Sequence, residues 1–185
     1  MIWQEASARV GIRIERSDHV FASYDGKGTL TLCNEDCFDP DDSLAQFIFH
    51  ELCHALVAGD NALSQQDWGM SNTDARDLPQ EHACHRLQAQ LADRHGLRAL
   101  FGVTTDHRPF WDALGAHPMQ GSPDDPSIAL AARGFERSRR APWLQPLDEA
   151  LRASARIADL LRDRAPSGSL WRHTLATPEP LNPPA

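Results

Sequence analysis

The sequence predicts an α+β fold, in which a small N-terminal antiparallel β-sheet packs on a helical core that further helices extend toward the C-terminus. Residues 10–33 contain apolar and polar residues in alternation, which is the pattern of half-buried strands. Residues 39–59 and 77–96 each carry a helix start signal, an apolar stretch and a stop signal. With 185 residues, of which 41% are hydrophobic, the chain can bury one core but hardly two.

Three short runs between residues 10 and 33 predict the strands of this sheet. Residues 10–14 (VGIRI) and 28–32 (GTLTL) alternate, and residues 19–23 (HVFAS) lie between them. The sequence Asp-Gly-Lys-Gly at positions 25–28 is a turn signal typical of a hairpin. Because consecutive short strands mostly pair with their neighbours, we expect an antiparallel meander.

The first long helix is predicted to begin at residues 39–42 and to end at Gly59. The sequence Asp-Pro-Asp-Asp at 39–42 supplies an N-cap, a proline for the first helical position and two acids for the positive end of the helix dipole. Residues 59–77 are then polar, rich in turn formers and without clear periodicity. We expect a long excursion over the surface there.

The second long helix begins near Asp77 and ends near residues 95–96. Asp77 is the expected N-cap, Pro79 suits the first turn, and Gln80 stands at the position of a capping box. A histidine followed by glycine at 95–96 marks the end. Amphipathic patterns predict further helices over residues 107–115, 126–139 and 146–164.

These elements predict one domain over residues 1–165. Residues 10–95 would form its core, and residues 97–165 would add the accessory helices. The segment 166–185 is rich in proline and has little to bury, so we expect a loose tail.

The composition excludes several classes of partner. Eighteen basic against 26 acidic residues give a net charge of -8, which opposes binding to nucleic acid or anionic lipid. No apolar run approaches the roughly 18 residues of a membrane span, and the N-terminal stretch is charged where a secretory signal is apolar. We therefore expect a cytoplasmic protein with no nucleic-acid or membrane partner. Its four cysteines are expected to be thiols: Cys33, Cys37, Cys53 and Cys84.

A candidate metal motif lies in the middle of the first long helix. His50, Glu51 and His54 form an H-E-x-x-H sequence with apolar residues on both sides. Residues four apart on a helix lie about 40° apart around its axis, so both imidazoles can reach one metal ion. Glu51 lies about 100° from His50, where it can accept a hydrogen bond from a metal-bound water without being a ligand. Burying these polar groups without a shared partner is unfavourable by several kcal/mol, which favours a metal.

Catalytic zinc ordinarily has three protein ligands and one open position, so a third ligand is required. Glu81 lies 27 residues after His54, one turn into the second helix, and is the best candidate. His82 and His85 compete with it. We favour Glu81 as the ligand and His85, on the same helix face, as a residue that orients a ligand or stabilises a charged intermediate. His82 is interpreted as a solvated helix residue.

The order of a small sheet, an HELCH helix, a polar excursion and a glutamate helix resembles the gluzincin zinc peptidases, most of all the compact ImmA/IrrE family. The resemblance covers roughly residues 10–95. It implies a zincin-like fold, with His50, His54 and Glu81 as zinc ligands and Glu51 as the general base. The sequence departs from the family pattern at Cys84, where a small alanine is usual, and at His85, where an Asn or Asp orients the metal site.

This site would hydrolyse peptide or amide bonds, with a protein or peptide as the substrate. Zinc lowers the pKa of its bound water toward 7, and Glu51 takes the proton. His85 or Tyr24 would then stabilise the oxyanion, although Tyr24 is more readily explained by packing in a hairpin. Trp68, in the polar excursion, either lines a substrate cleft or anchors the loop to the core.

Two other functions are compatible with the same residues. Two histidines and one carboxylate also form the facial triad of non-haem iron enzymes. A non-catalytic, metal-stabilised interaction module would need the metal ligands but not Glu51. The sequence does not specify the substrate or the oligomeric state.

Overall fold

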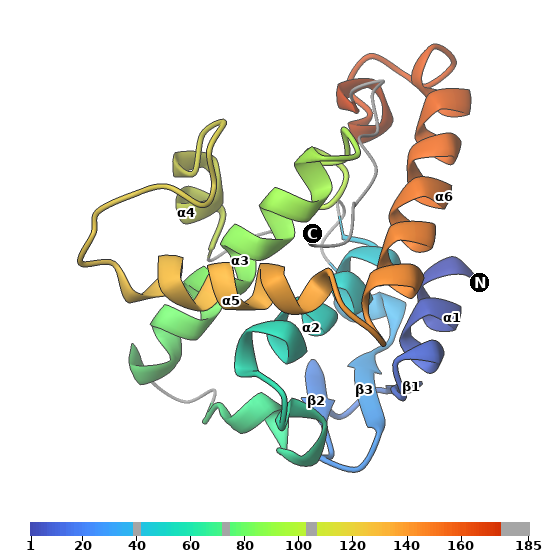
Figure 1. Ribbon diagram of the computed structural model, residues 1–185. Coiled ribbons are helices and arrows are strands. Elements are labelled where there is room, and N and C mark those ends of the chain that lie inside the picture. Colours follow the sequence, from blue (N-terminus) through green and yellow to red (C-terminus); the bar gives the residue numbers. More distant parts are fainter. Residues whose placement is uncertain (39–41, 72–74, 103–106, 175–185) are drawn as a thin grey trace.

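The computed structural model describes residues 1–38, 42–71, 75–102 and 107–174 (Figure 1). These residues form six α-helices and one three-stranded sheet, which confirms the predicted α+β class. The elements are α1 (Ile2–Arg9), β1 (Arg13–Ser17), β2 (Ala22–Tyr24), β3 (Thr29–Cys33), α2 (Leu44–Ala58), α3 (Leu78–Asp93), α4 (Arg108–Ala113), α5 (Pro126–Ser138) and α6 (Leu144–Arg162).

The sheet is mixed, so the predicted antiparallel meander is wrong. β3 lies between β1 and β2, and it pairs with β2 in antiparallel and with β1 in parallel orientation. The hairpin turn is where it was expected, and the Asp25 carboxylate accepts hydrogen bonds from the backbone N–H groups of Lys27 and Thr29. The four residues 18–21 instead carry the chain from β1 past β3 to the far edge. Alternation of apolar residues is the same in both strand orientations, so it could not reveal this order.

A short N-terminal helix, α1, was not predicted. Its Trp3 is buried, and the indole Nε1 donates a hydrogen bond to the Ser154 hydroxyl of α6 at 3.1 Å. The Trp3 ring also contacts the rings of Phe49 and Phe101, with centroids 4.8 and 5.4 Å away. Because α1 has only eight residues, its stability depends on this packing and its sequence signal is weak.

The helix that carries the H-E-x-x-H motif, α2, begins later than predicted and ends where predicted. Ser43 is its N-cap, and the Ser43 side chain accepts a hydrogen bond from the Gln46 backbone N–H. The predicted start at residues 39–41 lies outside the described residues. Gly59 closes the helix with a φ of 114°, a conformation that glycine adopts without strain. Most side chains of α2 are buried, so the motif is placed in the interior.

The second predicted helix, α3, packs against α2 on one side and α5 on another (Figure 1). Asp77 precedes it as predicted, but its carboxylate accepts hydrogen bonds from Ser71 and not from the helix. Gly134 of α5 allows the close approach, since a Cβ there would lie 2.9 Å from Leu87 Cδ2. Among its described residues, the excursion between α2 and α3 contains three short 3-10 turns and a β-bridge from Gln66 to Asp25. The three C-terminal helices agree with the predicted segments.

The folded part extends beyond residue 165. Leu170–His173 form a 3-10 turn, and Thr174 is buried. The Arg162 Nε donates a hydrogen bond to the Thr174 carbonyl at 2.7 Å, which ties this segment to α6. The rest of the predicted tail, 175–185, lies outside the described residues. In the described part of the chain, every helix is too short or too polar to cross a bilayer.

One histidine is buried without a polar partner. His95, just after α3, is 1% exposed, and neither of its ring nitrogens has a hydrogen-bond partner among the described residues. Burial disfavours the charged ring and lowers the pKa of His95 to about 4.

The stability of the fold should therefore decrease on acidification. Below the ordinary histidine pKa of about 6.5 the unfolded chain takes up a proton at this residue, and the folded chain does not until about pH 4. Between pH 7 and pH 5 we expect this residue to reduce the free energy of unfolding by up to about 2 kcal/mol, measured by urea denaturation.

The variant His95→Leu should lose this part of the pH dependence. His19→Leu, at an exposed histidine, is the matched control and should keep it. An unchanged pH slope in His95→Leu would contradict the assignment.

Candidate metal centre

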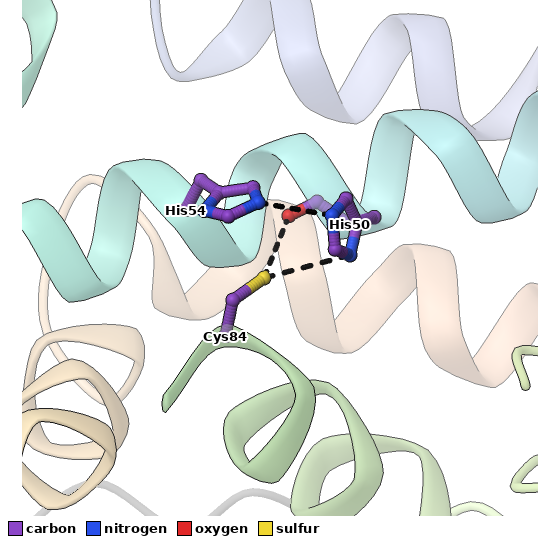
Figure 2. A group of neighbouring side chains, drawn as sticks. All are labelled: His50, His54 and Cys84. Carbon is purple, nitrogen blue, oxygen red and sulfur yellow. Dashed lines mark hydrogen bonds between the residues drawn. The ribbon is translucent and has the colours of Figure 1, made fainter. Parts of the chain in front are cut away.

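The helical spacing of His50 and His54 brings their two rings together. The Nε2 atoms are 2.9 Å apart, and the rings lie edge to face with centroids 4.5 Å apart. Figure 2 shows both rings projecting from α2 toward the same space, where α3 approaches. This is the arrangement that the four-residue spacing predicted.

Glu81 of α3 is the carboxylate that faces both imidazoles. Its Oε1 lies 3.4 Å from His50 Nε2, and its Oε2 lies 3.3 Å from His54 Nε2. The structure thus brings together the three residues predicted as ligands, on two packed helices. Zinc bonds to nitrogen and carboxylate oxygen at about 2.0–2.2 Å, so donors spaced in this way can converge on one ion with small adjustments.

The centre is partly accessible from solvent. The side chains of His50 and Glu81 are 21% and 19% exposed, while that of His54 is 4% exposed. A cation held there would therefore be protected on most sides, yet reachable by water or by a substrate group. The residues present fit a divalent cation by donor type, by spacing and by access.

The charges of the cluster depend on one another. Burial disfavours the charged form of His50, but hydrogen bonding and attraction to Glu81, together with the charge of Glu51, raise the pKa of His50 to about 9. Burial likewise opposes ionisation of Glu81, but the neighbouring imidazoles hold its pKa far below the ordinary range. His50 and Glu81 therefore form an ion pair. A bound divalent cation would take the place of the proton on His50.

His85 contacts the Glu81 carboxylate, as expected for a residue that orients a ligand. Its Nε2 lies 3.1 Å from Glu81 Oε1, and its side chain is 1% exposed. Burial lowers the pKa of His85 to about 3, so the ring is neutral and can donate its N–H to the carboxylate.

His82 is placed elsewhere. Its ring stacks on Phe110 of α4, with centroids 3.7 Å apart and planes 5° from parallel. Burial lowers the pKa of His82, and the ring is half-buried rather than solvated as predicted. Of the three competing candidates for the third ligand, Glu81 is thus the one that faces both imidazoles.

Cys84 also lies at the centre, and its contacts indicate a thiol. Its Sγ and the ring nitrogens of His50 and His54 lie within 4.8 Å of one another (Figure 2). The thiol donates a hydrogen bond to the His50 backbone carbonyl at 3.4 Å, and burial raises its pKa well above the ordinary value. These contacts agree with its interpretation as a small buried group. All four cysteines are free, as predicted.

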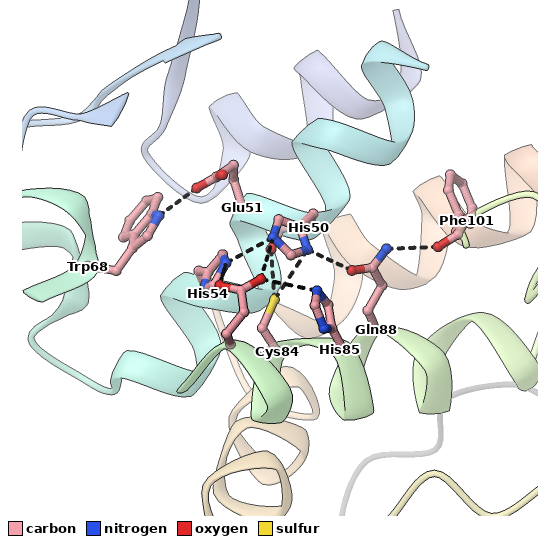
Figure 3. A network of polar contacts seen from close by, with 9 residues as sticks. His50, Glu51, His54, Trp68, Cys84, His85, Gln88 and Phe101 are labelled. Atoms are coloured by element: carbon pink, nitrogen blue, oxygen red, sulfur yellow. Dashed lines mark hydrogen bonds and ion pairs between the residues drawn. The ribbon is translucent and has the colours of Figure 1, made fainter. Parts of the chain in front are cut away.

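Glu51, the predicted general base, is buried and directed toward Trp68 (Figure 3). The indole Nε1 donates a hydrogen bond to Glu51 Oε2 at 2.7 Å. Such a bond to an ionised carboxylate is strong and fixes its orientation. Trp68 was predicted either to line a substrate cleft or to anchor the loop to the core, and this bond, with a side chain that is buried, shows that it anchors the loop.

The segment that carries Trp68 is fixed by strand β2. The Trp68 ring stacks on the Tyr24 ring, with centroids 3.9 Å apart. The carboxylate of Asp67 accepts hydrogen bonds from the Tyr24 backbone N–H and the Ser23 hydroxyl. Asp67 and Trp68 have positive φ angles of 46° and 58°, which are unfavourable for residues with side chains.

Tyr24 is fully buried and its hydroxyl donates to the Leu63 carbonyl, so it serves packing and not the oxyanion.

Sequence reasoning missed Gln88. It lies on α3, seven residues after Glu81, and its Oε1 is 2.9 Å from His50 Nδ1 (Figure 3). A spacing of seven places both residues on the same helix face, which is the one signal in the sequence that could have found it.

Comparisons with protein-family models, with curated proteins and with solved structures found no match to this chain. The likeness to gluzincin peptidases therefore stays a prediction from short motifs.

Removing one of the side chains predicted to bind the metal should weaken metal binding strongly. We expect His54→Ala and Glu81→Ala to lower Zn²⁺ affinity by more than about 100-fold, because losing a ligand exceeds the 10–100-fold effect of losing an outer partner. Competition with a chromophoric chelator measures this, with circular dichroism to verify folding. His82→Ala, one residue from Glu81, is the matched control and should bind Zn²⁺ normally. Equal weakening in all three variants would contradict the assignment.

Proposed function

We propose that this protein is a zinc-dependent hydrolase of peptide or amide bonds, built on a zincin-like arrangement of a small sheet and two metal-binding helices. The observation that carries the proposal is the convergence of two imidazole Nε2 atoms, from His50 and His54, with the Glu81 carboxylate. Glu51, adjacent to His50 in the sequence, supplies a buried carboxylate whose charge acts on His50. Two histidines and one acid leave an open position on a four-coordinate zinc.

Zinc bound there would polarise a carbonyl and lower the pKa of a coordinated water toward 7. Glu51 accepts a proton from the attacking water at Oε1, because Oε2 is already held by Trp68. The same carboxylate then passes the proton to the leaving nitrogen. His85 keeps the Glu81 carboxylate oriented through its N–H.

A second candidate is a non-haem iron enzyme, and the contacts of Glu51 and His85 favour it. Two histidines and a carboxylate also bind ferrous iron. Glu51 is directed toward Trp68 in Figure 3, which suits a chemistry that needs no general base at this position. One donor atom each of His50, Glu81 and His85 lies within 4.8 Å of the others, so a metal that takes more than four ligands would have His85 in reach if its Nε2 released the Glu81 carboxylate.

Substitution of the general base tests the hydrolase. Glu51→Gln should keep one equivalent of zinc and lose about 10²–10⁴-fold in kcat/KM, because the amide cannot take a proton. A mixture of fluorescence-quenched peptides serves as the substrate. Glu136→Gln, at a surface glutamate of α5, is the control and should remain active. Full activity in Glu51→Gln would reject the general base.

Metal content separates the two candidates. Protein purified without added metal should contain about one equivalent of zinc and cleave peptides without oxygen. Iron in its place, with activity that consumes oxygen and survives Glu51→Gln, would replace the hydrolase by the iron enzyme.

A further inference from the structure

We propose that Gln88 positions the metal ligand His50 by fixing which of its ring nitrogens carries the hydrogen. This inference rests on the proposed metal centre but not on the reaction catalysed there. Gln88 lies on α3 and is completely buried, at 0% exposure. A buried glutamine amide must use its hydrogen-bonding groups or destabilise the fold, so its two contacts indicate its role.

The orientation of the Gln88 amide follows from its second contact. The Nε2 atom lies 2.8 Å from the Phe101 carbonyl oxygen. A carbonyl only accepts hydrogen bonds, so the group that faces it must be the NH₂ of Gln88. The Oε1 atom therefore faces His50, 2.9 Å from Nδ1.

This orientation determines the tautomer of His50. Oε1 only accepts, so Nδ1 must carry the hydrogen that it receives. In the neutral ring the lone pair is then on Nε2, the atom that faces His54 and Glu81. A ring with the opposite tautomer would offer a hydrogen to the cation in place of a lone pair.

The Phe101 carbonyl is itself held in place. The Phe101 ring is 1% exposed and contacts the rings of Trp3 and Phe49, with centroids 5.4 and 5.2 Å away. At the next residue, the Gly102 carbonyl accepts a hydrogen bond from the side-chain amide of Gln46 on α2. The aromatic core thus fixes Phe101, Phe101 orients Gln88, and Gln88 orients His50.

His85 had been expected to orient a ligand, and the structure divides this role between two residues. His85 contacts the Glu81 carboxylate, and Gln88 contacts His50. The Nδ1 of His54 has no hydrogen-bond partner among the described residues. His50 is therefore the imidazole ligand whose tautomer the protein specifies through a side chain.

The experiment measures Zn²⁺ and Co²⁺ affinity by competition with a chelator, and the visible spectrum of the Co²⁺ protein. Gln88→Leu should bind both ions about 10–100-fold more weakly, with a changed Co²⁺ spectrum. Gln88→Glu keeps an acceptor for the His50 Nδ1–H, so its metal affinity should be close to that of the unsubstituted protein. It should also unfold at a lower temperature, because the Phe101 carbonyl loses its donor. Gln90→Leu, two residues along the helix, is the control and should leave affinity and spectrum unchanged.

A second measurement uses the unsubstituted protein, in case Gln88→Leu fails to fold. Two-bond ¹H–¹⁵N spectra of the zinc-loaded protein, with His50 assigned by comparison with His50→Ala, should show a protonated Nδ1 and a metal-bound Nε2. A metal-bound Nδ1, or a folded Gln88→Leu with the original affinity and spectrum, would overturn the inference. Failure of the unsubstituted protein to bind either ion would reject the metal centre as well, so the two failures are distinguishable.

Discussion

The contact on which the site depends is the one between the Glu81 carboxylate and the two imidazoles of α2. A buried carboxylate and buried histidines are unfavourable unless they share a partner, and here each supplies the other's partner across two packed helices. The contact requires α3 to lie against α2 at one register. Gly134 of α5 permits the close packing behind α3, and α1 and α5 also pack against α2. The fold thus brings the helices to the distance at which a single cation can bind.

Two sets of contacts hold the functional side chains in place, one around Glu51 and the other around His50. The segment with Asp67 and Trp68 adopts an unfavourable backbone conformation, and its contacts to β2 and to Glu51 compensate for it. Strain of this kind persists where surrounding contacts determine it, which is common at functional sites. On the other side, Gln88 connects His50 to the aromatic core through the Phe101 carbonyl. Side chains held in this way are oriented before a ligand arrives.

Local signals in the sequence predicted the centre better than they predicted its surroundings. The pairing of His50 with His54 follows from helix geometry alone, and the choice of Glu81 needed only two helices that pack. The strand order and helix α1 could not be predicted, because both depend on contacts between residues far apart in the sequence, such as Trp3 with Ser154. Trp68 was missed as the partner of Glu51 for the same reason, and Gln88 was missed as the partner of His50 although its spacing of seven from Glu81 places both on one face of α3. A hydrogen bond across the fold leaves no pattern in a single sequence.

The proposed function requires that His50, His54 and Glu81 share one divalent cation. Anomalous diffraction from crystals of the purified protein, recorded on both sides of the zinc absorption edge, tests it most directly. We expect one strong anomalous peak at about 2.0–2.2 Å from the two Nε2 atoms and from a Glu81 oxygen. Density showing the two rings turned apart with no peak between them, or a peak bound by Cys84 without Glu81, would contradict it.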